Sequence, residues 1–307
     1  MKTGFAIALV QQLRVKFIFG GALFFLAGLL FALTLGAPSD PSKFLLGYLI
    51  FLFGHVSVSF TNDHFDLALD RLAHRTPFSG GGGALLHARE LRSLVVPLAI
   101  LFSISSVLLA ILFKQMYGYP LWFPLFVIMG NLVGWVYSAP PIRLSRRGLG
   151  EPLTAAGAGI FMPGMGYLVA TGTFDIPFLL LSLPLIAYGV LFILSVEIPD
   201  READLLGGKR TLVVRCGRRA CIRAIAVSAI LATVLFIAFA ILEISPDSLN
   251  WWVVAGASLL PLASAILGFL RGNYFRRDSI PGAIRNLYAL IAFLVLTDLH
   301  LFLSILS

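Results

Sequence analysis

Long runs of residues without Asp, Glu, Lys or Arg constrain this chain more than any other feature of its sequence. Each of eight such runs has at least 19 residues, and a helix needs about 20 residues to cross the hydrocarbon core of a bilayer. The runs occupy residues 17–39, 44–62, 93–113, 115–142, 152–174, 176–196, 224–242 and 248–270, and a ninth candidate, 286–307, is interrupted by Asp298 and His300. The sequence therefore predicts an all-α, polytopic membrane protein whose nine transmembrane helices form one bundle around a central cavity, as a single domain over residues 1–307.

The composition supports this class and excludes others. The chain is 59% hydrophobic with a mean hydropathy of +0.94, and only 12% of its residues are charged, whereas soluble domains carry about 25% charged residues. A soluble fold, a disulfide scaffold and a disordered chain are therefore excluded. Strands of an outer-membrane barrel alternate in polarity, so the long uninterrupted runs also argue against a barrel.

The positive charges predict the orientation in the membrane. If all nine segments span, 21 of the 23 Lys and Arg residues fall on the side that holds the N-terminus, and only Lys43 and Lys114 fall on the other. Lys and Arg are enriched in cytoplasmic loops. We therefore expect a multi-pass protein of the cell membrane with a cytoplasmic N-terminus and an external C-terminus. The net charge of +8 is explained by this topology, and no nucleic-acid binding is expected because no separate basic domain exists.

Acidic residues gather at the cytoplasmic ends of two expected spans. Of the 15 Asp and Glu residues, four lie within 63–90 and four within 197–204. Steps of four residues advance a helix by about 400°, so residues at this spacing share one stripe. The first stripe consists of Asn62, Asp66 and Asp70, and the second of Asp200 and Asp204. Ser59 and His55 extend the first stripe toward the membrane interior.

The two acidic stripes predict a site for Mg²⁺ and a diphosphate. Carboxylates one turn apart repel each other, so a cation is expected between them. Oxygen donors without nearby Cys favour Mg²⁺ over zinc or copper, and Mg²⁺ usually completes its shell with water and substrate phosphates. Facing stripes would thus hold Mg²⁺ and clamp a diphosphate. For either cluster alone, a solvated helix end with local ion pairs is the alternative explanation.

Basic residues flank both stripes. They are Arg71 and Arg75 after the first, Lys209 and Arg210 after the second, Arg143, Arg146 and Arg147 on a third cytoplasmic loop, and Arg14 and Lys16 at the first span. Most of these cations are expected to set the topology and to bind anionic lipid headgroups. Diphosphate oxygens that a metal leaves uncovered need cationic donors, and Arg75, Lys209 and Arg210 are predicted to supply them.

Two features leave alternatives open. The run Gly80–Gly83 is either a flexible linker or the hinge of a lid, since residues 71–88 follow the first stripe directly. The main alternative to a lipid-modifying enzyme is a cation-coupled membrane transporter. Transporters place ion sites near the bilayer midplane on broken helices, whereas both acidic clusters here lie at one membrane end, which favours the enzyme.

These motifs resemble the UbiA superfamily of intramembrane prenyltransferases over essentially the whole chain. The family's Asn-x-x-x-Asp-x-x-x-Asp motif matches Asn62, Asp66 and Asp70, with an extra Asp at Asp63, and its Asp-x-x-x-Asp motif matches Asp200 and Asp204. Further matches are Gly208-Lys209-Arg210-Thr211, Tyr137-Ser138 with Pro140-Pro141 and Arg143, and Gly148-Leu149-Gly150-Glu151. Menaquinone-type members often have one extra residue before the last Asp of the first motif, a spacing that this chain lacks, so the resemblance does not point to a naphthoate acceptor.

The resemblance implies a reaction and roles for the motif residues. Such enzymes ionise an allylic polyprenyl diphosphate, for example geranylgeranyl diphosphate, and the prenyl cation alkylates a hydrophobic acceptor, an aromatic or quinone precursor or a prenylated glycerol phosphate. Mg²⁺ assists the release of diphosphate. The implied metal ligands are Asn62, Asp66, Asp70, Asp200 and Asp204, and the four Asp residues are also the implied catalytic groups. Tyr137 is a candidate to stabilise the prenyl cation through its ring, or else an interfacial anchor. The implied substrate-binding residues are Asn62, Arg14, Arg75, Ser138, Arg143, Lys209 and Arg210.

Overall fold

The computed structural model describes residues 2–81, 83–244, 249–272 and 275–306, with the side chains of 2–6 and 276–278 left aside. Within these ranges all regular structure is helical. The elements are α1 (Lys2–Gln12), α2 (Val15–Thr34), α3 (Pro41–Phe65), α4 (Leu67–Asp70), α5 (Ala84–His87), α6 (Arg89–Tyr117), α7 (Trp122–Ser138), η1 (Leu144–Arg146), α8 (Gly150–Ala156), η2 (Gly157–Phe161), α9 (Met162–Thr171), α10 (Ile176–Leu206), α11 (Leu212–Ile241), α12 (Trp251–Leu270) and α13 (Arg276–Leu306). Gly82, inside the glycine run, and residues 245–248, where the eighth apolar run was expected to begin, lie outside the described residues.

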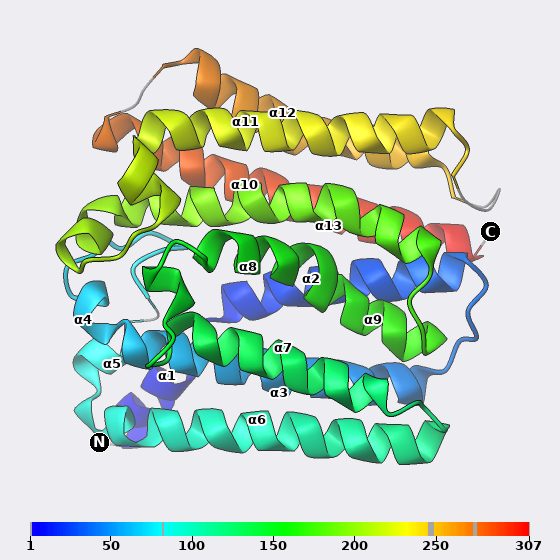
Figure 1. Ribbon diagram of the computed structural model, residues 1–307, viewed down its shortest axis with the longest axis horizontal. Helices are drawn as coiled ribbons and strands as arrows, with labels where there is room; N and C mark the ends of the chain where they lie inside the picture. The colour runs from blue at the N-terminus through cyan, green and yellow to red at the C-terminus, as the bar shows by residue number, and fades with distance from the viewer. Residues whose placement is uncertain (1, 82, 245–248, 273–274, 307) are drawn as a thin grey trace.

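The predicted all-α membrane bundle is confirmed. Eight spans in the described ranges are long and apolar enough to cross a bilayer, and α7 is a shorter apolar helix of 17 residues. The long helices run side by side along one axis (Figure 1). α7 is shorter than its apolar run of 115–142 because Gly118, with φ of 70°, ends α6 and because Ala139, which precedes Pro140, is extended. A residue before proline disfavours the helical region.

The fifth expected span is one crossing made of three pieces. α8 and α9 are joined by the π-helical turn η2, and together they form the span Gly150–Thr171. Such turns insert an extra residue into a helix and are frequent at functional sites. Gly157 and Phe161 of this turn line the central chamber described below.

Glycines allow α2 and α9 to pack at close range. A Cβ atom on Gly28 would lie 1.8 Å from the carbonyl oxygen of Pro163, and one on Gly166 would lie 2.0 Å from that of Phe25. Both distances are far inside van der Waals contact, so a side chain at either position is excluded by backbone. Small residues at interfaces are the usual means of helix association in membranes, and here they fix one wall of the bundle.

The ends of α3 and α10 bring the two acidic motifs to the same end of the bundle. α4, α5 and the start of α11 lie at this end too, whereas the last turns of α13 lie at the opposite end from α1 (Figure 1). An odd number of helical crossings places the first and last elements at opposite ends of the bundle, as observed here. The connection between α4 and α5 lies at the same end (Figure 1).

Candidate functional site

The first acidic motif lies where α3 ends. The helix stops at Phe65, and Asp66 is its C-terminal flanking residue, with its N–H donating to the Asn62 carbonyl at 2.9 Å. The Asp70 N–H donates to the Asp66 carbonyl at 3.0 Å, so the four-residue step continues from α3 into α4. The sequence predicted one unbroken stripe; the helix is instead interrupted at Asp66, but all three residues still line one chamber.

The second acidic motif lies on the last turns of α10, and a glycine turn follows it. α10 continues through Pro199 to Leu206, ten residues beyond the predicted span. Gly208 has a positive φ of 73°, and the Lys209 N–H donates back to the Asp204 carbonyl at 2.9 Å, a helix-ending geometry that favours glycine. The turn returns the Lys209 side chain toward the carboxylates of its own helix.

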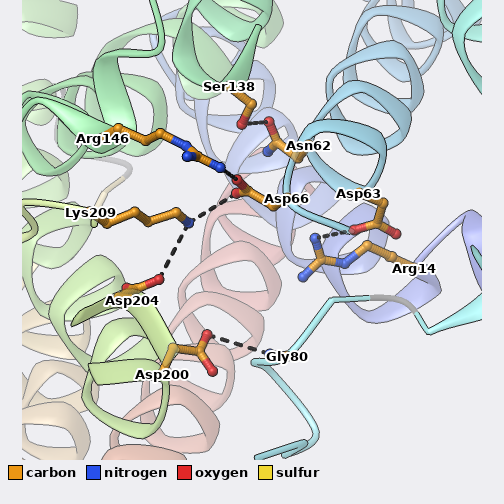
Figure 2. A network of polar contacts seen from close by, with 10 residues as sticks. All are labelled: Arg14, Asn62, Asp63, Asp66, Gly80, Ser138, Arg146, Asp200, Asp204 and Lys209. Carbon is orange, nitrogen blue, oxygen red and sulfur yellow. Dashed lines mark hydrogen bonds and ion pairs between the residues drawn. The ribbon is translucent and has the colours of Figure 1, made fainter. Parts of the chain in front are cut away.

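Lys209 joins the two acidic motifs. Its Nζ lies 2.9 Å from Asp66 Oδ2 and 3.5 Å from Asp204 Oδ1 (Figure 2). Burial disfavours the charged ammonium, but the carboxylates of Asp66 and Asp204 outweigh it and raise the pKa of Lys209 above its ordinary value. Arg146 Nη2 lies 4.0 Å from Asp66 Oδ1, so a second cation approaches the same carboxylate.

Gly80 and Gly81 lie against the remaining two carboxylates, Asp200 and Asp70. The Gly80 N–H donates to Asp200 Oδ2 at 3.4 Å (Figure 2). A Cβ atom on Gly81 would lie 1.9 Å from Asp70 Oδ2, which shows how closely the backbone passes that carboxylate. Burial raises the pKa of Asp70 to about 7, and the negative charges of Asp63 and Asp66 add to the effect. The segment therefore contacts both acidic motifs, which is the position that the lid interpretation requires.

Asp63 and Asn62 are held by neighbouring helices. Asp63 accepts from Gln12 Nε2 at 3.0 Å. Figure 2 shows that Asp63 also accepts from Arg14 Nη1, at 3.2 Å, and that Asn62 Oδ1 accepts from Ser138 Oγ, at 2.7 Å. Arg14 adopts a left-handed conformation, with φ of 49°, between α1 and α2. These contacts fix α3 against α1, α2 and α7 at the site.

A chamber of about 360 Å³ extends from the carboxylates into the bundle. The predicted site residues in its lining are Arg14, Asn62, Asp66, Asp70, Tyr137, Asp200, Asp204 and Lys209. Farther in, its wall is largely apolar, with Phe126, Phe161 and Met165 among the lining residues. The chamber thus joins a charged mouth to an apolar interior.

Four predicted substrate-binding residues lie outside the chamber lining. They are Arg75, Arg143, Arg210 and Ser138, and Ser138 bonds to Asn62, which does line the chamber. Arg75 packs against the glycine run, since a Cβ atom on Gly83 would lie 1.6 Å from its Nη2. Arg210 is exposed, and Arg143 has an Nε atom that is buried without a hydrogen-bond partner in the described part of the chain. Arg146, rather than Arg143, approaches Asp66 from the third loop. The positions of Arg143 and Arg146 depend on the local geometry of the loop, which spacing along the sequence does not specify.

The chamber also contains groups that sequence reasoning did not select. Glu197, one turn before Asp200, is buried in the lining, and its Oε2 has no hydrogen-bond partner among the described residues. Gly80 and Gly81 line the chamber through their backbone. Glu197 opens the second acidic cluster in the sequence, and that spacing was the one available signal. Nothing in a glycine run indicates which carboxylate its N–H groups will reach.

The donor set suits Mg²⁺ bound together with a phosphate-bearing ligand. Asp200 Oδ1 is buried without a hydrogen-bond partner in the described ranges, and the nearby donors are carboxylate and amide oxygens. Among the described residues, no three Asp, Glu, His or Cys side chains come together as a metal site. Asp63, Asp66 and Asp204 are each paired with a cation instead. Mg²⁺ commonly uses only one or two carboxylates and takes its other ligands from substrate phosphates and water.

Comparisons with known proteins agree with this architecture. The chain is 22% identical over 233 residues to a 1,4-dihydroxy-2-naphthoate octaprenyltransferase from Bacillus subtilis (strain 168), covering 75% of this chain and 73% of that protein. It is 26% identical over 219 residues to a homogentisate phytyltransferase from Synechocystis sp. (strain ATCC 27184 / PCC 6803 / Kazusa), covering 68% and 65%. The fold is similar to that of a UbiA homologue from Archaeoglobus fulgidus solved with DMAPP and Mg²⁺, with a TM-score of 0.67, 16% identity and coverage of 97% and 99%.

The family model covers most of the chain. The UbiA prenyltransferase family matches residues 22–280, a stretch that includes both acidic motifs and the transmembrane helices except the start of α2 and most of α13. The predicted family resemblance is confirmed. With the paired acidic motifs at one end of a helical membrane bundle, this match establishes that the chain belongs to the UbiA prenyltransferase family.

Proposed function

We propose that this protein transfers a polyprenyl group from an allylic polyprenyl diphosphate to a lipophilic acceptor, with Mg²⁺-assisted release of diphosphate. The observation that carries the proposal is the chamber, whose mouth is lined by carboxylates of both motifs and whose interior is apolar. An allylic polyprenyl diphosphate has the matching polarity, an anionic head on a hydrocarbon tail. The three relatives named above act on or bind prenyl compounds according to their names.

The acidic residues are proposed to act together with metal. Asp66, Asp70, Asp200 and Asp204 alone would repel a diphosphate, so they need a divalent cation between them and the substrate. Bound Mg²⁺ would neutralise the charge that the diphosphate gains as its bond to carbon breaks. Asn62 offers an amide oxygen beside the first motif.

Cationic side chains are proposed to hold the remaining diphosphate oxygens. Lys209 is the cation nearest to both motifs, and Arg14 also lines the chamber. Ser138 orients Asn62 through its hydrogen bond. Arg75, Arg143 and Arg210 remain candidates that would need to change conformation to reach a diphosphate in the chamber.

The apolar interior is proposed to protect the prenyl cation. Water would capture the cation as an alcohol, so a wall of Phe and Met side chains protects the transfer by excluding it. The Tyr137 ring lines the chamber near the acidic motifs, where an aromatic face can stabilise positive charge. The proposed acceptors are an aromatic or quinone precursor or a prenylated glycerol phosphate; the two curated relatives are named for hydroxylated aromatic acids.

The proposal is tested with purified protein and radiolabelled geranylgeranyl diphosphate against a panel of acceptors from both classes. We expect a prenylated product with at least one acceptor, loss of product in EDTA and its recovery when Mg²⁺ is added. Full activity in metal-free protein would overturn the metal's role. Uptake of a solute into proteoliposomes that is driven by a cation gradient and needs no diphosphate substrate would instead support a transporter.

The orientation is proposed from the charge distribution. The end with both acidic motifs carries most of the Lys and Arg residues, and we place it, with the N-terminus, in the cytoplasm. The C-terminal end of α13 would then lie outside.

A further inference from the structure

His55 and Ser59 form a pair of polar side chains on α3, one turn apart, on the stripe that leads inward from Asn62. We propose that this pair binds a hydroxyl group of the acceptor and so selects hydroxyl-bearing acceptors. The proposal rests on the proposed prenyl transfer, and it adds an acceptor subsite and the chemical group that the subsite recognises.

Both side chains line the chamber. Ser59 is 6% exposed, and His55 retains a partly accessible surface. A Cβ atom on Gly21 of α2 would lie 2.3 Å from His55 Cε1 and 2.4 Å from Nδ1, so one edge of the imidazole packs directly against α2. The Phe51 ring meets the imidazole edge to face, with 5.5 Å between centroids. The ring is therefore fixed by packing, with its other edge available to the chamber.

Neither side chain has a hydrogen-bond partner among the residues that the structure describes. Other polar groups deep in the chamber are already bonded, since Ser106 donates to the Ile50 carbonyl at 2.8 Å and Asn131 donates to the Val127 carbonyl at 2.9 Å. The buried side-chain atoms that lack a partner in the described ranges do not include those of His55 or Ser59, so the polar atoms of both residues are accessible from the chamber that they line. His55 and Ser59 are thus left free to bond to a ligand in an otherwise largely apolar wall.

The position of the pair suits an acceptor. His55 is seven residues from Asn62, which is about 10 Å along a helix, so it lies between the carboxylates and the deeper apolar wall. A neutral imidazole nitrogen can accept a hydrogen bond and a serine hydroxyl can donate one. A single hydroxyl group does both at once, whereas a methoxy group can only accept. The pair should therefore discriminate between the two.

The test measures hydroxyl preference without needing the natural acceptor. Full-length protein in amphipol is titrated calorimetrically with 1-naphthol and with 1-methoxynaphthalene, and the signal from amphipol alone is subtracted. We expect 1-naphthol to bind about tenfold more tightly, a preference that corresponds to one good hydrogen bond. His55→Leu should reduce the preference to about twofold or less, because it removes the acceptor that only 1-naphthol can use, and His55→Gln should keep most of it. Ser59→Ala should instead weaken the binding of both naphthalenes, because the oxygen of either ligand can accept a hydrogen bond from Ser59.

Ser106→Ala is the matched control. This serine lines the same chamber, but its hydroxyl is engaged by the Ile50 carbonyl, so the preference should not change. The proposal is wrong if the unsubstituted protein fails to bind 1-naphthol, if it binds both naphthalenes equally, or if His55→Leu keeps the full preference.

A second measurement separates this proposal from the proposed function. Binding of geranylgeranyl thiolodiphosphate, a donor analogue that resists ionisation, should need Mg²⁺ and Asp200 but not His55 or Ser59. If His55→Leu tightens binding of the analogue and leaves the naphthol preference intact, the prenyl tail occupies this part of the chamber and the acceptor subsite is wrong. If Asp200→Asn leaves binding of the analogue unchanged, the donor site is wrong, whereas the hydroxyl preference would still stand.

Discussion

At the scale of single residues, the two acidic motifs are proposed to be catalytic rather than structural. Asp66→Asn or Asp200→Asn should lower turnover by about 10²-fold or more, which is roughly 2.7 kcal/mol of transition-state stabilisation. Folding should survive, because Lys209 keeps Asp204 as a partner when Asp66 is replaced, and replacing Asp200 relieves its repulsion with Asp204 in metal-free protein. Product formation per folded molecule, with the folded fraction measured by size-exclusion chromatography, checks both expectations.

Asp40→Asn is the control for this prediction. Asp40 caps α3 by accepting hydrogen bonds from the Ser42 and Lys43 N–H groups at 3.1 Å, and Asn caps helices equally well. Turnover and stability should therefore stay unchanged. If Asp66→Asn instead destabilised the protein while turnover per folded molecule stayed intact, its carboxylate would be only an ion-pair partner of Lys209.

Lys209 supplies the positive charge between Asp66 and Asp204, so Lys209→Gln should lower the Tm in metal-free buffer. Two carboxylates would lose their buried partner, and removing one member of a buried ion pair is strongly destabilising. Mg²⁺ should then raise the Tm more in the variant than in the unsubstituted protein, because the metal restores the missing charge. Thermal unfolding with and without Mg²⁺ measures this difference. Lys114→Gln, at the end of the bundle opposite Lys209, should show no such difference in its response to Mg²⁺.

At the scale of helices, much of the site could be predicted because helical spacing is regular. Asn62, Asp66 and Asp70 line one chamber as their spacing predicted, and Lys209 contacts both motifs. The four-residue step requires only helical geometry, and a cation was expected wherever carboxylates gather. Both inferences depended only on the types of residue and on their spacing, which the sequence gives directly.

Other features of the helices depend on contacts that spacing does not display. The π-helical turn at Gly157–Phe161 interrupts an apolar run that appears continuous in the sequence. The break at Gly217, with φ of 79° and ψ of 164°, lies inside α11, in the charged segment before the apolar run 224–242 begins. Glycine is tolerated inside a membrane helix as well as at a break, so Gly217 alone does not predict its conformation. The sequence likewise did not show whether Arg143 or Arg146 approaches Asp66, because this depends on the turn between them.

The packing of α2 against α9 gives a prediction at this scale. Gly28→Ala should destabilise the detergent-purified protein, because the new Cβ would lie 1.8 Å from the backbone oxygen of Pro163 and backbone cannot move aside as a flexible side chain can. Gly256→Ala is the matched control, since its Cβ would meet no atom within 4 Å and alanine favours helix. The Tm of each variant is compared, and equal Tm values for Gly28→Ala and the unsubstituted protein would contradict the packing.

At the scale of the whole molecule, the bundle has chemically different ends. The ends of α3 and α10, which carry the acidic motifs, lie at the same end of the bundle as the connection between α4 and α5 (Figure 1), so the proposed substrate would bind with its anionic head at that end. The apolar runs and the uneven distribution of Lys and Arg predicted this difference between the two ends from the sequence alone. Both features are expected of a chain whose helices cross a bilayer. Which compartment each end faces is the part that rests on charge statistics.

The two free cysteines allow the orientation to be measured. Cys216 is exposed and Cys221 is buried, and both lie near the start of α11, at the end that carries the acidic motifs. A membrane-impermeant maleimide added to intact cells should therefore leave Cys216 unlabelled, whereas it should label Cys216 in inverted membrane vesicles. In a Cys216→Ser background, Leu121→Cys should react in intact cells, because Leu121 is 65% exposed and lies in the α6–α7 connection at the opposite end. Labelling of Cys216 in intact cells, with Leu121→Cys protected, would reverse the orientation and place the proposed diphosphate site outside the cytoplasm.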